Sequence, residues 1–355
     1  MRKPRLSAAL AASLAAVISF GSQAATKDHF SVCWTIYAGW MPWEYGATQG
    51  IVDKWAKKYG IDIDVVQLND YVESINQYTA GQFDGCTMTN MDALTIPAAG
   101  GVDSTALIVG DFSNGNDGIV IKGENKTLAD LKGTPVNLVE LSVSHYLLAR
   151  GLERAGLSEK DLKVVNTSDA DLVGAFASDE VKAVATWNPL LAEVAATPKV
   201  SKVFDSSEIP GEIIDLMVVN SETLEDNPAL GKALTGAWYE IMATMAADTP
   251  AGKAAREHMA KASGTDLAGF EAQLAATKMF YSAKEAVEFT NSGRLRETMG
   301  KVADFSFAHG LLGEGAPSAE AIGMRFAGGL VRGDQDNVKL RFEPRYMQMA
   351  ADGKL

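Results

Sequence analysis

Alternation of apolar and polar positions marks the start of the folded chain. Every second residue from Phe30 to Ile36 is apolar, which is the period of a half-buried strand. The next segment, 37–44, contains Gly39 and Pro42, residues that break regular structure, among three further aromatic rings and an acid. The pattern therefore predicts a strand followed by an aromatic loop.

The strand and helix periods then alternate along the chain. Predicted strands lie at 61–68, 83–87, 105–110, 119–122, 135–139, 162–166, 183–186 and 213–220. Predicted helices lie between them at 45–59, 72–80, 127–132, 144–155, 170–177 and 189–196, and the pattern after 220 is helical to about 331. Such an order predicts an α/β protein with two doubly wound, largely parallel halves and a helical C-terminal region.

Two crossings divide these halves into lobes with a cleft between them. The first crossing is expected near 116–119 and the return near 215–220. The prediction is a first lobe of 25–117 and 217–355 and a second lobe of 118–216, since 355 residues exceed what one core usually serves.

Residues 1–24 have the pattern of a secretory signal peptide. Basic residues at positions 2, 3 and 5 precede an apolar run from Leu6 to Phe20 and a small-x-Ala site. Cleavage is expected after Ala24 or Ala25, and the mature protein is expected in the periplasm. No Cys lies directly after this site, so the sequence does not indicate a lipid anchor.

Negative charge is concentrated in the first half of the chain. The formal net charge is -13, which argues against nucleic acid as a partner. Between Tyr59 and Ile121 there is no Lys, Arg or His, although nine acids fall in that stretch. A lobe that contains it can offer an anion little beyond backbone N–H groups, whereas it can bind a cation well.

Motifs for catalysis or metal binding do not occur in the sequence. It has no G-x-S-x-G, HExxH or phosphate-binding loop, and its four His show no paired-ligand spacing. We therefore expect no enzyme activity, cofactor or metal. Export would permit a disulfide between Cys33 and Cys86, but both lie in apolar, strand-like runs where buried free thiols are common.

Five segments of the mature chain resemble the substrate-binding proteins of ABC importers, in the nitrate/sulfonate/taurine-like group. They are VCWTIYAGWMPW (32–43), GQFDG (81–85), LVELSVSHYLLARGLERAGL (138–157), VATWNPLLAEV (184–194) and LMVVNSETL (216–224). The end of the chain, FEPRYMQMAADGKL (342–355), is similar to the subgroup associated with urea and guanidine enzymes.

This resemblance implies a type II periplasmic-binding fold, in which two lobes close on a ligand. It also implies a membrane permease and a separate ATPase as partners, and we expect a monomer. Carried over by position, ligand contacts would come from loops after the strands: Tyr37, Trp40, Trp43, Glu44, Asn90, Asp92, Asn114, Asp117, Glu140, Ser142, Ser144, Trp187, Asn188 and Asp215.

The acids in these loops depart from what an anion receptor needs. Guanidinium is planar, always protonated and able to bond carboxylates in pairs while an aromatic face covers it. The sequence therefore predicts a small planar cation, with guanidinium first. Urea or another small amide or amine, then taurine, a sulfonate or nitrate, remain alternatives. A sensory role without import also stays open, whereas a pyrimidine-precursor synthase is disfavoured because the first lobe lacks a cofactor-anchoring Lys or His.

Overall fold

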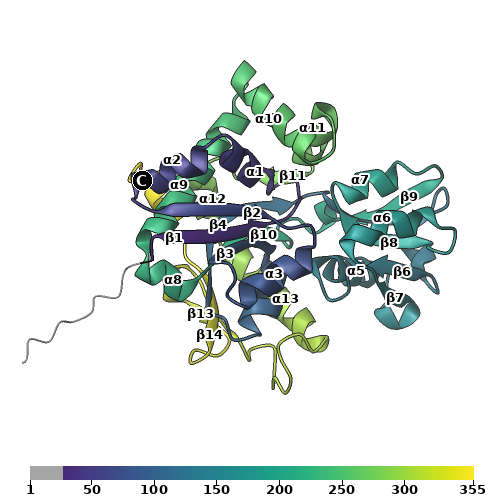
Figure 1. Cartoon of the computed structure of the whole chain (residues 1–355). Helices are drawn as coiled ribbons and strands as arrows, with labels where there is room; N and C mark the ends of the chain where they lie inside the picture. The colour runs from purple at the N-terminus through teal and green to yellow at the C-terminus, as the bar shows by residue number, and fades with distance from the viewer. Residues whose placement is uncertain (1–26) are drawn as a thin grey trace, which may run out of the picture.

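Two lobes lie side by side in the protein (Figure 1). The computed structural model describes residues 27–355, so the predicted signal peptide and its cleavage site lie outside the described residues. The first lobe, which carries the C-terminus, is built on a nine-stranded sheet, and the second on a five-stranded sheet. Within 27–355 no helix has the length and apolarity needed to cross a membrane.

The sheet of the first lobe mixes parallel and antiparallel pairs. Strands β1, β2 and β3 are parallel, and β10 runs antiparallel between β3 and β4. In spatial order the strands are β13 (Val331–Arg332), β12 (Gly323–Arg325), β14 (Val338–Phe342), β4 (Ser104–Ser113), β10 (Ile214–Asn220), β3 (Gly85–Thr89), β1 (His29–Trp34) and β2 (Asp62–Gln67), with β11 (Thr277–Met279) paired to β4.

Helices cover both faces of this sheet. Its central strands β3 and β4 are therefore buried on both sides. In Figure 1, α1, α2 and α9 lie on one face and α3 and α13 on the other. The helices of this lobe are α1 (Met41–Thr48), α2 (Ile51–Lys58), α3 (Tyr71–Thr79), α4 (Asn90–Ala93), α8 (Ser221–Asp226), α9 (Pro228–Ala246), α10 (Pro250–Ala262), α11 (Leu267–Ala275), α12 (Ala283–Thr290), α13 (Gly293–Ala308) and α14 (Arg345–Ala351).

The second lobe repeats the design on a smaller scale. Its strands run in the order β7 (Lys163–Asn166), β6 (Pro135–Leu138), β8 (Ala183–Trp187), β5 (Asp117–Lys122) and β9 (Val200–Asp205). Its helices are α5 (Val143–Arg154), α6 (Asp169–Ala177) and α7 (Leu190–Ala195). Strand β5 enters from the first lobe and is antiparallel to both of its neighbours.

Several stretches differ from the sequence prediction, among them β9, which the pattern did not predict. The expected aromatic loop is shorter, because α1 begins at Met41 with Pro42 in its first turn, where the fixed φ of proline suits a helix. The C-terminal region after α13 is not helical throughout but adds β12, β13 and β14 to the sheet. The reason is visible in Val338–Phe342, VKLRF, whose apolar side chains are buried at every second position.

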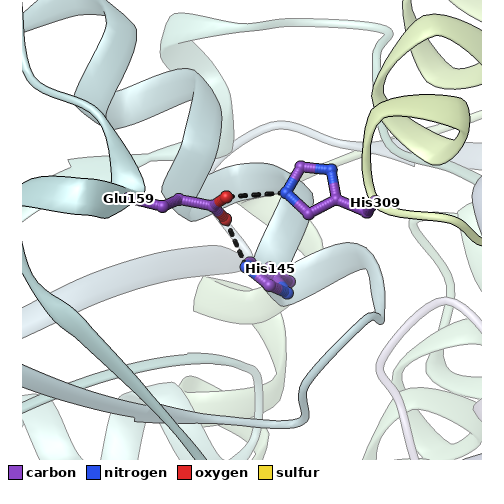
Figure 2. Close-up of side chains that lie close together, drawn as sticks. All are labelled: His145, Glu159 and His309. Carbon is purple, nitrogen blue, oxygen red and sulfur yellow. Dashed lines mark hydrogen bonds and ion pairs between the residues drawn. The ribbon is translucent and has the colours of Figure 1, made fainter.

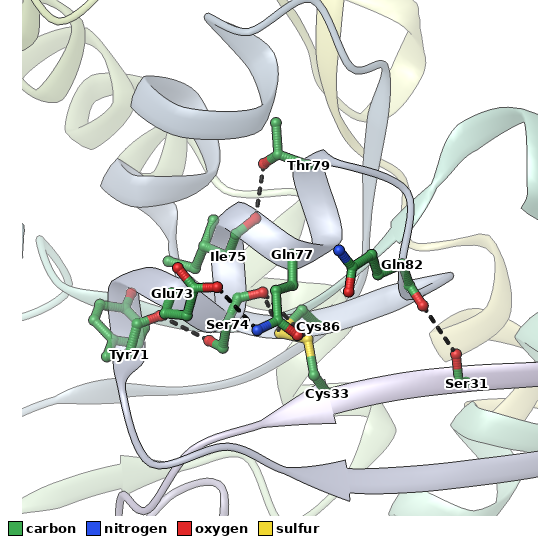
Figure 3. The surroundings of a disulfide bond; sticks show 10 residues. All are labelled: Ser31, Cys33, Tyr71, Glu73, Ser74, Ile75, Gln77, Thr79, Gln82 and Cys86. Carbon is green, nitrogen blue, oxygen red and sulfur yellow. Dashed lines mark hydrogen bonds between the residues drawn. A yellow bond between two sulfur atoms is a disulfide. The ribbon is translucent and has the colours of Figure 1, made fainter.

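Cys33 and Cys86 form a disulfide, so the preference for free thiols was wrong (Figure 3). The two residues lie directly opposite each other on the neighbouring strands β1 and β3, with their Cα atoms 4.4 Å apart. Both sulfur atoms are near the carbonyl oxygen of Ser74 in α3, at 3.5 and 3.7 Å. The apolar runs did place both residues in the core, but a single sequence does not show which strands are neighbours.

Side chains from α13 tie the first lobe to the second. Glu212, just before β10, accepts hydrogen bonds from Arg150 Nε in α5 (2.9 Å) and from Lys301 Nζ in α13 (2.6 Å). Farther along, Glu159 of the second lobe lies between His145 of α5 and His309, which follows α13 (Figure 2). The contacts of Lys301 with Glu212 and of His309 with Glu159 thus join the lobes outside the connecting strands.

The ligand-type atoms of His145, Glu159 and His309 lie within 4.8 Å of one another, the spacing of a metal site. However, Nδ1 of His145 accepts the backbone N–H of Leu141 (3.1 Å), so the ring proton is on Nε2, the nitrogen that faces Glu159. A metal ligand would need a lone pair on that atom. We therefore interpret this cluster as a hydrogen-bonded bridge between the lobes.

Candidate ligand-binding site

Several strand ends meet where the first lobe faces the second. Strands β1, β3 and β4 point the same way, so their carboxyl ends share one edge, and antiparallel β10 begins there. Strand β5 of the second lobe starts four residues after β4 ends. In open α/β sheets this edge is where ligands bind.

A small cavity lies at this edge, between the lobes. It encloses about 280 Å³ of empty space including its open side, a size that suits a small ligand. The wall is formed by Tyr37, Trp40, Tyr71, Thr89, Asp117, Val143, Trp187, Ile213 and Asp215.

Four aromatic rings form a continuous chain along this wall. Tyr37 meets Trp40 edge to face at 5.1 Å between ring centroids, and Trp40 stacks on Tyr71 at 5.6 Å. Tyr71 in turn meets Trp187 of the second lobe edge to face at 5.7 Å. The aromatic surface therefore crosses from one lobe to the other, and it presents ring faces and edges to the cavity.

Tyr71 is held in place by a buried polar network. Its hydroxyl donates to Asp92 Oδ2 (2.6 Å) and accepts the backbone N–H of Thr89 (2.9 Å), while Thr89 Oγ1 also donates to Asp92 (2.8 Å). Burial raises the pKa of Asp92 to about 6, although these bonds and the backbone N–H of Val143 oppose the rise. Asp92 thus positions a cavity residue and lies at the start of α5.

Three further carboxylates gather at the cavity. Asp117 and Asp215 lie on its wall, and Asp111 sits beside Asp215 on the neighbouring strand. Burial raises the pKa of Asp117 and of Asp111 to about 7. It raises the pKa of Asp215 well above the ordinary value, with the negative charge of Asp111 as the next cause.

Basic side chains in 27–355 form ion pairs with other acids and not with the four carboxylates at the cavity. Within residues 27–355, no Lys, Arg or His forms an ion pair with Asp92, Asp111, Asp117 or Asp215. Both oxygens of Asp111, Oδ2 of Asp215, the Tyr37 hydroxyl and the Trp40 indole N–H are buried without a hydrogen-bond partner in that range. Buried charge of one sign without compensation is costly, so these groups indicate a missing partner.

Five of the predicted contact residues lie on the cavity wall: Tyr37, Trp40, Asp117, Trp187 and Asp215. Others lie nearby but face different partners. Trp43 and Glu44 fall on α1, where Trp43 packs against Trp238 (5.2 Å between centroids) and Glu44 pairs with His258 (3.0 Å). Asn90 accepts the N–H of Ile214 (2.9 Å).

The remaining predicted residues are also off the wall. The backbone N–H of Asn114 bonds the carbonyl of Ala276 (2.9 Å), and the Glu140 side chain is exposed. Ser142 caps α5 through the N–H of Ser144, whose own hydroxyl is buried without a partner in 27–355. Asn188 donates to Asn116 Oδ1 (2.5 Å) at the crossing.

Sequence reasoning placed Tyr71 at the rim of the cleft, after the second strand, but ranked it below the other candidates. It did not single out three wall residues, Thr89, Val143 and Ile213, or Asp111 behind them. Asp111 had a readable signal, because it is an acid inside the otherwise apolar run of β4, from Ala106 to Phe112. Val143 and Ile213 are apolar and carry no such signal.

One protein-family model matches more than half of the chain. The family model described as "NMT1/THI5 like" matches residues 55–251. The chain belongs to the NMT1/THI5-like family. A binding protein of Brucella suis biovar 1 is 24% identical over 259 residues, which cover 72% of this chain and 79% of that protein.

Solved structures similar to this family member share its fold. The alkanesulfonate-binding protein of Xanthomonas axonopodis pv. citri, bound to MOPS, matches with a TM-score of 0.67 at 18% identity over 84% of this chain and 99% of that one. The aliphatic sulphonate binding protein of Escherichia coli matches with a TM-score of 0.65 at 19% identity over 80% and 94%. The type II periplasmic-binding fold predicted from the sequence is confirmed.

Both of these solved structures are described as binding proteins. The taurine-binding periplasmic protein of Escherichia coli is a further relative, 24% identical over 144 residues, or 39% of this chain and 44% of that protein. These relatives agree on the kind of protein, and the ligand has to be argued from the cavity.

Proposed function

We propose that this protein binds a small planar cation, guanidinium first, between its lobes and delivers it to an ABC permease driven by a separate ATPase. The observation that carries the proposal is the set of buried carboxylates at the cavity, with no basic partner in 27–355 and aromatic rings around them. A predicted signal peptide, which would bring the protein to the periplasm, fits this role.

Guanidinium suits both parts of this wall. Its N–H groups point outward in one plane and can reach two carboxylates, here Asp117 on β5 of the five-stranded sheet and Asp215 on β10 of the nine-stranded sheet. An aromatic face over that plane adds about 0.5–2 kcal/mol, depending on how dry the contact is. Because the two acids come from different lobes, a cation between them would hold the lobes together.

An anion fits the same wall poorly. The relatives named for sulfonates and taurine make such a ligand the natural comparison. The N-terminus of α5 reaches the cavity at Val143 and could attract an anion, but the backbone N–H of Val143 faces the carboxylate of Asp92. An anionic ligand would also meet the uncompensated charges of Asp117 and Asp215.

Urea is the second candidate, and one observation favours it. The indole N–H of Trp40 is a buried donor without a partner in 27–355, and it could bond a carbonyl oxygen. Asp117, with its pKa raised to about 7, could also be protonated beside a neutral ligand. Guanidinium is preferred because it compensates the carboxylates, whereas urea leaves each ionised one unpaired at a cost of several kcal/mol.

Calorimetry of the protein without residues 1–24 against guanidinium, urea, taurine and nitrate tests the proposal. We expect guanidinium to bind and Asp117→Asn to weaken it about 30-fold or more, because losing one partner of a buried charge pair costs about 2–5 kcal/mol. The matched control is Glu44→Gln, an acid of the same edge that pairs with His258 off the wall, and its affinity should change less than about twofold.

The outcomes separate the candidates. Binding of taurine or nitrate without guanidinium would refute the cation. Binding of urea alone would keep the cavity and remove the charge argument. Equal losses in Asp117→Asn and Glu44→Gln would mean that the ligand sits elsewhere.

A further inference from the structure

A row of polar side chains crosses the sheet at the floor of the cavity. Asp111 on β4 is directly opposite Asp215 on β10, and Asp215 is directly opposite Thr89 on β3. Residues opposite each other in an antiparallel pair point to the same face, with Cβ atoms about 5 Å apart. The two carboxylates are therefore neighbours, and like charges in that arrangement repel.

No positive charge relieves the repulsion between these two acids. Asp111 is fully buried and Asp215 is 3% exposed. Three of their four oxygens have no well-formed hydrogen bond in residues 27–355, and no ion pair reaches either acid there. The titratable groups near them are the carboxylate of Asp117 and the phenols of Tyr37 and Tyr281, and of these only the Tyr37 hydroxyl lowers their pKa values.

Gly39 helps to close off this pair from water. A Cβ at this position would lie 2.4 Å from Asp111 Oδ2 and 2.7 Å from a Tyr37 ring carbon. Only a residue without a side chain lets the main chain of the first loop lie against the carboxylate. Water therefore has little access to the pair, and two negative charges cannot both persist there.

We propose that Asp111 and Asp215 share a proton in the empty site and that a bound cation displaces it, so that ligand binding releases a proton. The proposal rests on the proposed function for its ligand. It assigns Asp111, which is off the cavity wall, the role of setting the charge of Asp215, which is on it. The cation takes over the balancing charge, and the proton leaves to solvent.

This exchange also defines which ligands the site accepts. A neutral amide brings no charge to replace the proton, so it would bind the protonated pair without proton release. A cation binds better as the pair ionises. Burial raises the pKa of Asp111 to about 7 and that of Asp215 well above its ordinary value, so the pair still holds a proton at and above neutral pH.

Calorimetry with guanidinium in two buffers of different ionisation enthalpy, phosphate and Tris, measures the released protons. We expect about one proton per guanidinium near pH 8, where Asp117 is already ionised, and an affinity that rises up to tenfold per pH unit while the pair still holds its proton. Asp111→Asn should release almost none and flatten this pH dependence, whereas Glu44→Gln should behave as the wild type. Binding heats that are independent of buffer, with a Kd independent of pH, would overturn the proposal.

A ligand-free measurement separates this proposal from the proposed function. Carboxyl ¹³C NMR of the aspartate-labelled protein, from about pH 4 to pH 9, should show two coupled carboxyls titrating far above the ordinary value of about 3.9, and one of them should return toward it in Asp111→Asn. If guanidinium does not bind, the proposed function fails, but this titration still decides whether a proton is shared. Ordinary titration of both acids would refute the sharing.

Discussion

Replacing Tyr71 by Phe removes one oxygen atom from the cavity wall and leaves the ring. The lost hydroxyl is bonded on both sides, to Asp92 Oδ2 at 2.6 Å and to the N–H of Thr89 at 2.9 Å. Both partners are buried, so water cannot take its place. The substitution thus tests whether the polar network behind the wall holds it in shape.

The expected loss of stability follows from these two bonds. A hydrogen bond to a charged group contributes about 1.5–3 kcal/mol, and a stranded buried N–H costs about 1–3 kcal/mol. Protonation of Asp92, whose pKa is already raised to about 6, relieves part of the first cost. We expect Tyr71→Phe to lower the free energy of unfolding by about 3–5 kcal/mol.

The assay is thermal unfolding, since urea and guanidinium are both candidate ligands. At about 2 °C per kcal/mol, the midpoint should fall by about 6–10 °C. The control is Tyr78→Phe in the same helix, which loses one neutral bond to Ser104 (2.8 Å) away from the cavity and should cost about 1 kcal/mol. Equal shifts in the two variants would refute the network as described.

Two further predictions concern the disulfide and the bridge between the lobes. Cys33 and Cys86 are 53 residues apart, so the double variant Cys33→Ala with Cys86→Ala should lose about 4 kcal/mol of the free energy of unfolding, measured by thermal unfolding. An unchanged midpoint would contradict this prediction. A midpoint of the double variant that falls further when a thiol reductant is added would contradict it as well. Hydrogen bonds from His145 lower the pKa of Glu159 to about 2, so the stability it contributes is present above its unfolded pKa of about 4.3 and is lost as the pH falls toward 2. Glu159→Gln should therefore flatten the acid limb of the pH–stability curve, and an acid limb as steep as that of the wild type would mean that the bridge does not form.

Local patterns were enough to predict most strands and the edge at which the site lies. Alternation identified β1, and the position of Tyr37 and Trp40 just after it brought both to the cavity. The return near 215–220 was also expected, and Asp215 lies at that edge. These features depend on neighbours in the chain, which a sequence shows directly.

Features that depend on distant neighbours were not predictable in this way. The pairing of Cys33 with Cys86 needs β1 beside β3, and the pairing of Glu44 with His258 needs α1 beside α10. Glu140 follows an apolar strand and Asp111 lies inside one, yet Glu140 is exposed and Asp111 is fully buried. Only the packing of the lobes distinguishes the two acids.

The size of the cavity has a consequence for selectivity in the cell. The cavity is narrow between its aromatic and acidic walls, so the proposed guanidinium ligand would leave no space beside it for an alkyl tail. Arginine, agmatine and creatine all present a guanidino head on such a tail, and each would hold the lobes apart. A receptor of this shape would therefore reject these three molecules and bind only free guanidinium.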